Sequence, residues 1–296
     1  MFAAALVSLL AAVGPMVSSP YRGAISIDAQ TGQVLSESGA DVKAYPASVT
    51  KLMTAYLVLD DVAAGRLKLT DAVVASKCVT KADAHYRQPS CIGLAPGEAK
   101  SVDEMLVWLM VHSANDAAIY LAEKCSGSVA AFVARMNAKA KQLGMASTAY
   151  YNPNGLPPPP SAKERRFNVS TCRDQVRLAR ALLKAHPEIL RYTSIKNIKL
   201  PAPNVRDRRR VMEPRNIVNH NNLMVKNKLK VINPDGSEAI DGLKTGYIDA
   251  GGSSIVLTGK RKGKRAIVVV LGSARAAERD EHAGRLLNDA LSAIAW

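Results

Sequence analysis

Two residues near position 50 have the side chains and the spacing for nucleophilic catalysis. Ser48 and Lys51, in the stretch ASVTKLMTAY, are three residues apart at the expected start of a helix. This spacing places a hydroxyl and an amine on one helical face, where an unprotonated lysine could activate the serine. Ser48 could equally be a helix N-cap that follows Pro46, because serine is a preferred N-cap residue. A Ser-x-x-Lys pair alone does not decide between these two interpretations.

Two further short motifs follow this pair in the chain. The triplet SAN occupies 113–115, between two expected helices, and the triplet KTG occupies 244–246, within a β-rich C-terminal part. Ser-x-x-Lys, a Ser-x-Asn-type triplet and Lys-Thr-Gly form the motif set of penicillin-binding proteins and class A β-lactamases. Each motif is weak alone, but the three in this order are specific. We therefore expect Ser48 to be a nucleophile rather than a cap.

The elements that must position these motifs are strands at both ends of the chain and helices between them. Alternating polarity in GAISIDAQTGQVL predicts a β-hairpin around Thr31 and Gly32. Residues 242–273 predict three strands, of which AIVVVL is fully buried. Helices are expected from Ser48 to about Ala64, from the capping box Ser101/Glu104 onward, from Asp116, over 129–144, over 173–186 and over 276–296. This order predicts an α+β domain whose terminal strands share one antiparallel sheet.

The chain resembles the serine-type D-alanyl-D-alanine carboxypeptidases, low-molecular-mass penicillin-binding proteins of the β-lactamase/transpeptidase-like superfamily. The likeness runs from about Arg22 to Ser273, through ASVTKLMTAY, HSANDAA, NPNGL, NHNNLM and DGLKTGY. It implies an α+β fold in which an antiparallel sheet flanked by helices joins an all-helical lobe, with the active site between them. We expect one catalytic domain over 20–296. Because only about fifty residues follow Gly246, we expect no second β-rich domain and no C-terminal membrane anchor, which many relatives carry.

The resemblance implies a catalytic role for four residues. Ser48 would be the nucleophile and Lys51 the general base, Ser113 would relay a proton to the leaving amine, and Asn115 would hold Lys51 and the substrate amide. The amine of Lys51 must then be neutral. Lowering its pKa from about 10.4 to about 7 costs roughly 4 to 5 kcal/mol, which burial and nearby cations such as Lys244 could supply.

The resemblance also implies a substrate-binding role for residues of the C-terminal half. Lys244, Thr245 and Gly246 would lie on an edge strand, where the substrate peptide pairs and its carboxylate binds. The N–H of Tyr247 and that of the nucleophile would form the oxyanion hole. His220 stands where the family often has an arginine near the carboxylate. We expect either a carboxylate-binding imidazolium with a pKa of about 6.5 or a surface histidine.

The expected reaction is removal of the terminal D-alanine from peptidoglycan stem peptides through an acyl-enzyme, with β-lactams as covalent inhibitors and without a cofactor. A DD-endopeptidase acting on cross-linked stem peptides is an alternative that the sequence does not separate. A class A-like β-lactamase is less favoured. Glu164 in ERRFN imitates the E-x-x-L-N element of those enzymes, but it follows a four-proline loop and is expected to lie too far from Ser48. A catalytically inactive peptidoglycan-binding module is disfavoured because all motif residues are present.

Charge and the N-terminal residues bear on partners and location. The net charge of +15 admits anionic partners, but three Phe, two Trp and scattered basic residues argue against nucleic acid. The basic run 206–210 is expected to be a solvated loop. The apolar run 2–14 is too short to span a bilayer. We expect 1–19 to be a signal-peptide remnant, although no basic residue precedes Arg22, and a buried N-terminal helix is the alternative. The mature chain is then periplasmic or cell-wall-associated, without an integral membrane segment.

Four cysteines are compatible with an oxidising compartment and allow three pairings. Cys78 and Cys91 bracket a short polar segment, so we expect them to pair, and then Cys125 with Cys172. Buried free thiols are the alternative. No cysteine or histidine has a metal-binding spacing, so we expect no metal site.

Overall fold

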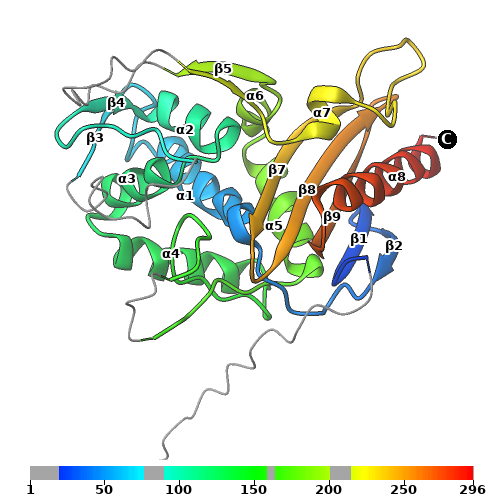
Figure 1. Cartoon of the computed structure of the whole chain (residues 1–296), viewed down its shortest axis with the longest axis horizontal. Helices are drawn as coiled ribbons and strands as arrows, with labels where there is room; N and C mark the ends of the chain where they lie inside the picture. Colours follow the sequence, from blue (N-terminus) through cyan, green and yellow to red (C-terminus); the bar gives the residue numbers. More distant parts are fainter. Residues whose placement is uncertain (1–19, 77–89, 159–163, 201–214, 296) are drawn as a thin grey trace, which may run out of the picture.

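The computed structural model describes residues 20–76, 90–158, 164–200 and 215–295, so the expected signal-peptide remnant and the basic run 206–210 lie outside the described residues. A five-stranded antiparallel sheet lies beside a group of helices (Figure 1). The strand order is β2-β1-β9-β8-β7, which confirms that strands from both ends of the chain share one sheet. The strands are β1 (Gly23–Asp28), β2 (Val34–Ser38), β7 (Ile240–Ile248), β8 (Gly252–Arg261) and β9 (Lys264–Ser273).

The strand β9 is central and has both faces covered. Val268 and Val270 point into the core under helix α8 (Ala276–Ile294), and Ile267 and Val269 point into the core shared with α5 (Cys172–Ala185). Successive strand residues face opposite sides of a sheet. A strand buried on both sides therefore reads as a continuous apolar run, which explains AIVVVL.

Four helices form a lobe beside the β7 edge of the sheet, on the left of Figure 1. They are α1 (Lys51–Ala63), α2 (Val102–Val111), α3 (Asn115–Ser126) and α4 (Val129–Gln142), and α1 contacts each of the other three. Helices α6 (Ile189–Thr193) and α7 (Asn222–Lys226) contact β7. Two short pairs complete the described elements, β3 (Ala72–Val74) with β4 (Ala99–Ser101) and β5 (Asn197–Leu200) with β6 (Arg215–Val218).

Helix boundaries agree with most of the signals in the sequence. Ser101 and Glu104 form the expected capping box at the start of α2, and α4 ends just before Gly144, which has a φ of +70°. The start of α1 differs from the expectation. Ala47–Thr50 form a 3₁₀ turn, η1, and the α-helix begins only at Lys51, with no side-chain cap. The N-cap interpretation of Ser48 is therefore wrong.

In the described part of the chain, no single helix is both long and apolar enough to cross a membrane. The helices α3 and α4 pass such a test as a pair, by length and composition only, and the pair is bent by 86°.

Candidate active site

The side chain of Lys51 joins three segments that are far apart in the sequence. Its Nζ lies 2.9 Å from Ser48 Oγ, 2.8 Å from Asn115 Oδ1 and 2.8 Å from the backbone oxygen of Asn154. Lys51 is fully buried in the first turn of α1, whereas Ser48 is half-buried in η1. The serine and lysine identified from the sequence are thus in hydrogen-bond contact, as nucleophile and base must be.

The environment of Lys51 favours its neutral form. Burial of the amine is the main cause that lowers its pKa well below the usual value, and the positive charge of Lys244 lowers the pKa further. Asp116 acts in the opposite direction, but it is less effective. These are the two causes that the sequence suggested, and both favour the neutral amine that a proton acceptor for Ser48 would need.

Ser113 lies in the short connection between α2 and α3, directly before the helix that Asn115 begins. Ser113 is buried and has a φ of +61°, a conformation that serine rarely adopts. Asn115 is the first residue of α3 and donates its backbone N–H to Ser90 O at 2.8 Å. Backbone strain of this kind is retained where the surroundings fix it, and it concentrates at functional sites. The tight turn places Asn115 Oδ1 on Lys51.

Asp116 fixes the segment that covers this turn, and the sequence reasoning gave it no role. Its buried carboxylate accepts the N–H groups of Ile92 (3.0 and 2.9 Å to the two oxygens) and Gly93 (2.9 Å). Burial raises the pKa of Asp116. The only sequence signal for this role is its place directly after Asn115.

The KTG triplet lies on β7, the edge strand of the sheet, as expected. A Cβ atom added to Gly246 would lie 2.7 Å from Pro46 O and 3.0 Å from Ser48 N. Only glycine allows the strand to approach the nucleophile turn this closely. Tyr247 follows on the same strand, with its side chain 60% exposed. Gly246 therefore brings the edge strand next to the backbone N–H of Ser48.

Lys244 is the second buried lysine of the site. Its Nζ donates to Thr245 O at 3.0 Å, and burial, followed by the charge of Arg279, lowers its pKa to about 7. Arg279 is itself buried and donates through Nε and Nη2 to Asp280 Oδ1, at 2.9 and 2.6 Å. Lys244 thus changes charge near neutral pH, a property that its sequence position did not reveal.

His220 is exposed, as the surface-histidine alternative expected, and its ring lies edge-on to the ring of His112 at 6.3 Å between centroids. Desolvation and the positive charge of Lys244 lower the pKa of His220 to about 4. The expected pKa of 6.5 is therefore wrong, because that value belongs to an isolated histidine. At neutral pH His220 is an uncharged hydrogen-bonding group in the free protein.

Glu164 does not adopt the arrangement of a catalytic base. Its carboxylate pairs with Arg166 at 2.6 Å, and its side chain is 68% exposed. The asparagine of the same ERRFN stretch, Asn168, is instead 3% exposed and bonds to the η1 turn. The likeness to the β-lactamase element is thus confined to the sequence.

The predicted disulfide between Cys125 and Cys172 is not formed. Cys91, Cys125 and Cys172 are free thiols, and Cys78 lies outside the described residues. Cys125 lies near Asp61 and Arg135 at the end of α3, whereas Cys172 begins α5 next to Gly23 of β1. The two thiols belong to different parts of the fold, which sequence spacing could not indicate. In the described ranges, no group of three or more His, Cys, Asp or Glu could hold a metal ion.

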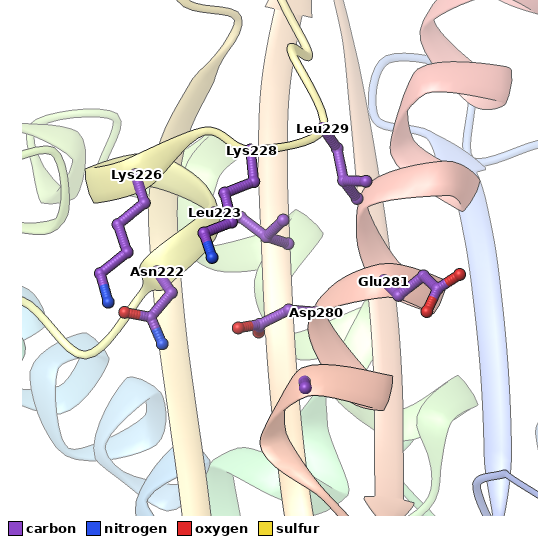
Figure 2. A pocket seen from close by; sticks show the side chains of 8 residues that line it. Asn222, Leu223, Lys226, Lys228, Leu229, Asp280 and Glu281 are labelled. Atoms are coloured by element: carbon purple, nitrogen blue, oxygen red, sulfur yellow. The ribbon is translucent and has the colours of Figure 1, made fainter.

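A cavity of about 340 Å³ lies between α7 and the first turns of α8 (Figure 2). None of the predicted catalytic residues lines it, and its wall is formed by Asn222, Leu223, Lys226, Lys228, Leu229, Ala277, Asp280 and Glu281. Asp280 is the acceptor for Arg279, whose charge lowers the pKa of Lys244. The ion pair of Arg279 with Asp280 therefore links a residue of the cavity wall to a charge that acts on Lys244 of the edge strand.

The fold is that of the penicillin-binding proteins. The crystal structure of the D-alanyl-D-alanine carboxypeptidase DacD from Francisella tularensis matches with a TM-score of 0.78 and 27% identity, over 95% of this chain and 72% of that chain. Penicillin-binding protein D2 from Listeria monocytogenes, in its ampicillin-bound form, matches with a TM-score of 0.70 and 28% identity, over 93% of this chain and 100% of that chain.

Residues 16–275 match Peptidase_S11, the D-alanyl-D-alanine carboxypeptidase family, and the chain belongs to this family. It is 31% identical over 271 residues to the D-alanyl-D-alanine carboxypeptidase DacF of Bacillus subtilis, which covers 92% of this chain and 62% of DacF. It is 33% identical over 253 residues to DacC of Escherichia coli, covering 85% of this chain and 56% of DacC. The chain thus spans about three fifths of the length of these two curated relatives.

Proposed function

We propose that this protein is a serine DD-carboxypeptidase that removes the terminal D-alanine from peptidoglycan stem peptides through an acyl-enzyme on Ser48. The observation that carries the proposal is the contact of a half-buried serine hydroxyl with a fully buried lysine amine, at 2.9 Å. Membership of the D-alanyl-D-alanine carboxypeptidase family and the names of its relatives support the proposal that the substrate ends in D-alanyl-D-alanine.

Acylation begins with the neutral amine of Lys51. Lys51 Nζ accepts the proton of Ser48 Oγ while Oγ attacks the carbonyl carbon of the penultimate D-alanine. The developing oxyanion accepts the N–H groups of Ser48 and Tyr247, which the close approach at Gly246 supports. Ser113 relays the proton to the amine of the departing D-alanine. The C–N bond then breaks and leaves an ester on Ser48, which water hydrolyses.

Substrate binding uses the β7 edge. A stem peptide pairs with β7 as an added strand, and its terminal carboxylate binds Thr245 and protonated Lys244. His220 donates a hydrogen bond to the same carboxylate as a neutral imidazole. Because the pKa of Lys244 is about 7, a bound carboxylate favours its charged form.

The remaining expectations about the whole protein belong to this proposal. Residues 20–296 form one catalytic unit, which the family match over 16–275 supports. Peptidoglycan lies outside the cytoplasm, so the protein is exported, and the apolar run 2–14 is compatible with a signal peptide. β-Lactams acylate Ser48, as the ampicillin-bound structural relative suggests.

Digestion of purified muropeptides tests the proposed reaction. Pentapeptide muropeptides are expected to lose one D-alanine, a mass decrease of one residue, because the β7 edge and Lys244 receive a free terminal carboxylate. Cross-linked dimers are expected to remain intact under the same conditions. The products are measured by liquid chromatography and mass spectrometry. Conversion of dimers to monomers at a comparable rate would establish the endopeptidase instead. If neither tetrapeptide nor monomer forms, DD-peptidase activity is refuted.

The lifetime of the penicilloyl-enzyme distinguishes the peptidase from a β-lactamase. We expect Glu164→Ala to leave this lifetime within a few-fold of wild type, on the order of minutes to hours, because Glu164 is exposed and paired with Arg166. Hydrolysis ~10⁵-fold faster would need roughly 7 kcal/mol of additional transition-state stabilisation. Intact-mass decay after removal of free penicillin measures the lifetime, and Arg166→Ala is the matched control. Rapid cephalosporin hydrolysis that Glu164→Ala abolishes would identify a β-lactamase.

A further inference from the structure

The buried side chain of Asn168 connects two segments of the active site. Its Oδ1 accepts the N–H groups of Tyr151 at 2.7 Å and Asn152 at 3.2 Å. Its Nδ2 donates to Asn152 O at 2.9 Å and to Thr50 Oγ1 at 3.1 Å. Both hydrogens of the amide and both lone pairs of its oxygen thus have protein partners. Asn168 therefore holds the 151–156 segment against the η1 turn that carries Ser48.

The 151–156 segment, which contains NPNGL, is itself built as a rigid turn. Asn152 Oδ1 accepts the N–H of Gly155 at 2.6 Å, and Asn152 Nδ2 donates to Leu156 O at 2.9 Å. Gly155 has a φ of +82°, and a Cβ added there would lie 1.9 Å from Ala47 O. The turn therefore packs directly on the residue before the nucleophile, where Ala47 has a φ of +50°.

This turn presents the backbone oxygen of Asn154 to Lys51 Nζ at 2.8 Å. A neutral lysine amine has two hydrogens and one lone pair. Asn154 O and Asn115 Oδ1 can only accept, so they take both hydrogens, and the lone pair is left facing Ser48 Oγ at 2.9 Å. The Asn154 oxygen thus sets the direction in which Lys51 acts as a base.

We propose that Asn168 is a positioning residue for the general base: it fixes the 151–156 turn so that Asn154 O binds Lys51 and directs the amine lone pair at Ser48. This inference rests on the proposed function, because it concerns the acylation step. Asn168 acts through the turn and does not touch the substrate. All hydrogen-bonding groups of the Asn168 side chain have protein partners, so none is left to hold a water molecule for hydrolysis of the acyl-enzyme.

The rate constant for acylation of Ser48 by benzylpenicillin tests the proposal. Asn168→Ala is expected to lower this constant by about 30-fold or more, since small displacements of catalytic groups have effects of this order. KM for a D-Ala-D-Ala peptide is expected to change less than about threefold, while kcat falls. Water that enters beside the released turn restores hydration of Lys51, so its pKa rises and the acidic limb of the acylation profile moves to higher pH. The charged or ionisable groups that act on Lys51, namely Lys244 of β7, Asp116 of α3 and Cys91, are unchanged in the variant.

Asn137→Ala is the matched control. The side chain of Asn137 makes three hydrogen bonds to the backbone of Tyr150 and Val133. Asn137 belongs to α4, so it holds Tyr150 on that helix and, among the described residues, has no hydrogen bond to the η1 turn. We expect its acylation rate to remain within about threefold of wild type, with an unchanged pH profile. A similar loss and a similar pH shift in Asn137→Ala would overturn the proposal, because general loosening would then explain both.

A wild-type rate and profile in Asn168→Ala would also overturn it. If Asn168→Ala does not fold, Thr50→Val removes only the hydroxyl that Asn168 Nδ2 contacts, and the same pH shift with at least about a fivefold loss of rate is expected. An unchanged Thr50→Val profile would then contradict the role. Failure of the wild-type protein to form any acyl-enzyme would instead refute the proposed function.

Discussion

Benzylpenicillin is expected to add one penicilloyl group to the wild-type protein, and Ser48→Ala is expected to abolish this adduct. Ser48 is the hydroxyl in contact with the buried amine of Lys51, at 2.9 Å, and alanine cannot form the ester. Loss of a catalytic nucleophile lowers a rate by ~10⁴-fold or more. Intact-mass analysis measures the adduct, and peptide mapping locates it.

Ser113→Ala controls for the second serine of the site. Ser113 has a proposed proton-relay role, so its variant is expected to be labelled more slowly but still on Ser48. Circular dichroism of both variants would show that they are folded. An adduct on Ser113 in the wild-type protein, or an adduct that persists in Ser48→Ala, would contradict the assignment of the nucleophile.

The sequence predicted the parts of the site that consist of side chains in short motifs. Ser48 and Lys51 are three residues apart, so their contact depends on one local turn, and the KTG strand was recognisable from its residue types. The sheet was also predictable, because the GAISID and AIVVVL stretches have the apolar patterns of strands. These features depend on residue types and on their spacing over a few positions, both of which can be seen in the sequence.

The features that the sequence could not predict depend on contacts across the chain. Asn154 acts through its backbone oxygen, which every residue has, so its type gives no signal for a lysine ligand. Asn168 was read as part of a β-lactamase-like element, because its spacing from Glu164 was visible and its contact with Thr50 was not. A buried amide that joins residues 118 positions apart is recognised only in the folded chain.

The pKa values of His220 and Lys244 were unpredictable for a related reason. Each value depends on burial and on cations that come from other elements, including Arg279 of α8. The sequence contains these residues but not the distances between them. The site therefore has a positive character in which His220 is neutral and Lys244 titrates near pH 7, and a bound carboxylate is the natural counter-charge.

Replacement of Lys51, the proposed general base, is expected to have the second largest effect. Lys51→Met is expected to lower the acylation rate constant by ~10³- to 10⁴-fold, because methionine fills a similar volume but cannot accept the Ser48 proton. Lys51→Arg is expected to be similarly inactive. Arginine can donate hydrogen bonds to Asn115 and Asn154, but it remains protonated, so it cannot act as a base. Near-wild-type acylation of either variant would rule out Lys51 as the base.

The acylation rate of the wild-type protein is expected to depend on pH through the protonation of Lys51. Only the neutral form of Lys51 accepts a proton, so at saturating benzylpenicillin, whose bound carboxylate favours the charged form of Lys244, the acylation rate falls as pH decreases below the Lys51 pKa and reaches a plateau above it. Burial, followed by the charge of Lys244, lowers that pKa well below the ordinary lysine value of 10.5. The plateau is therefore expected to begin well below pH 10, as measured from acylation rates between pH 5 and 10.5. A rate that continues to rise tenfold per unit up to pH 10 would mean that Lys51 titrates as an exposed lysine. The hydrogen-bonded site described for Ser48 would then not be the state that reacts.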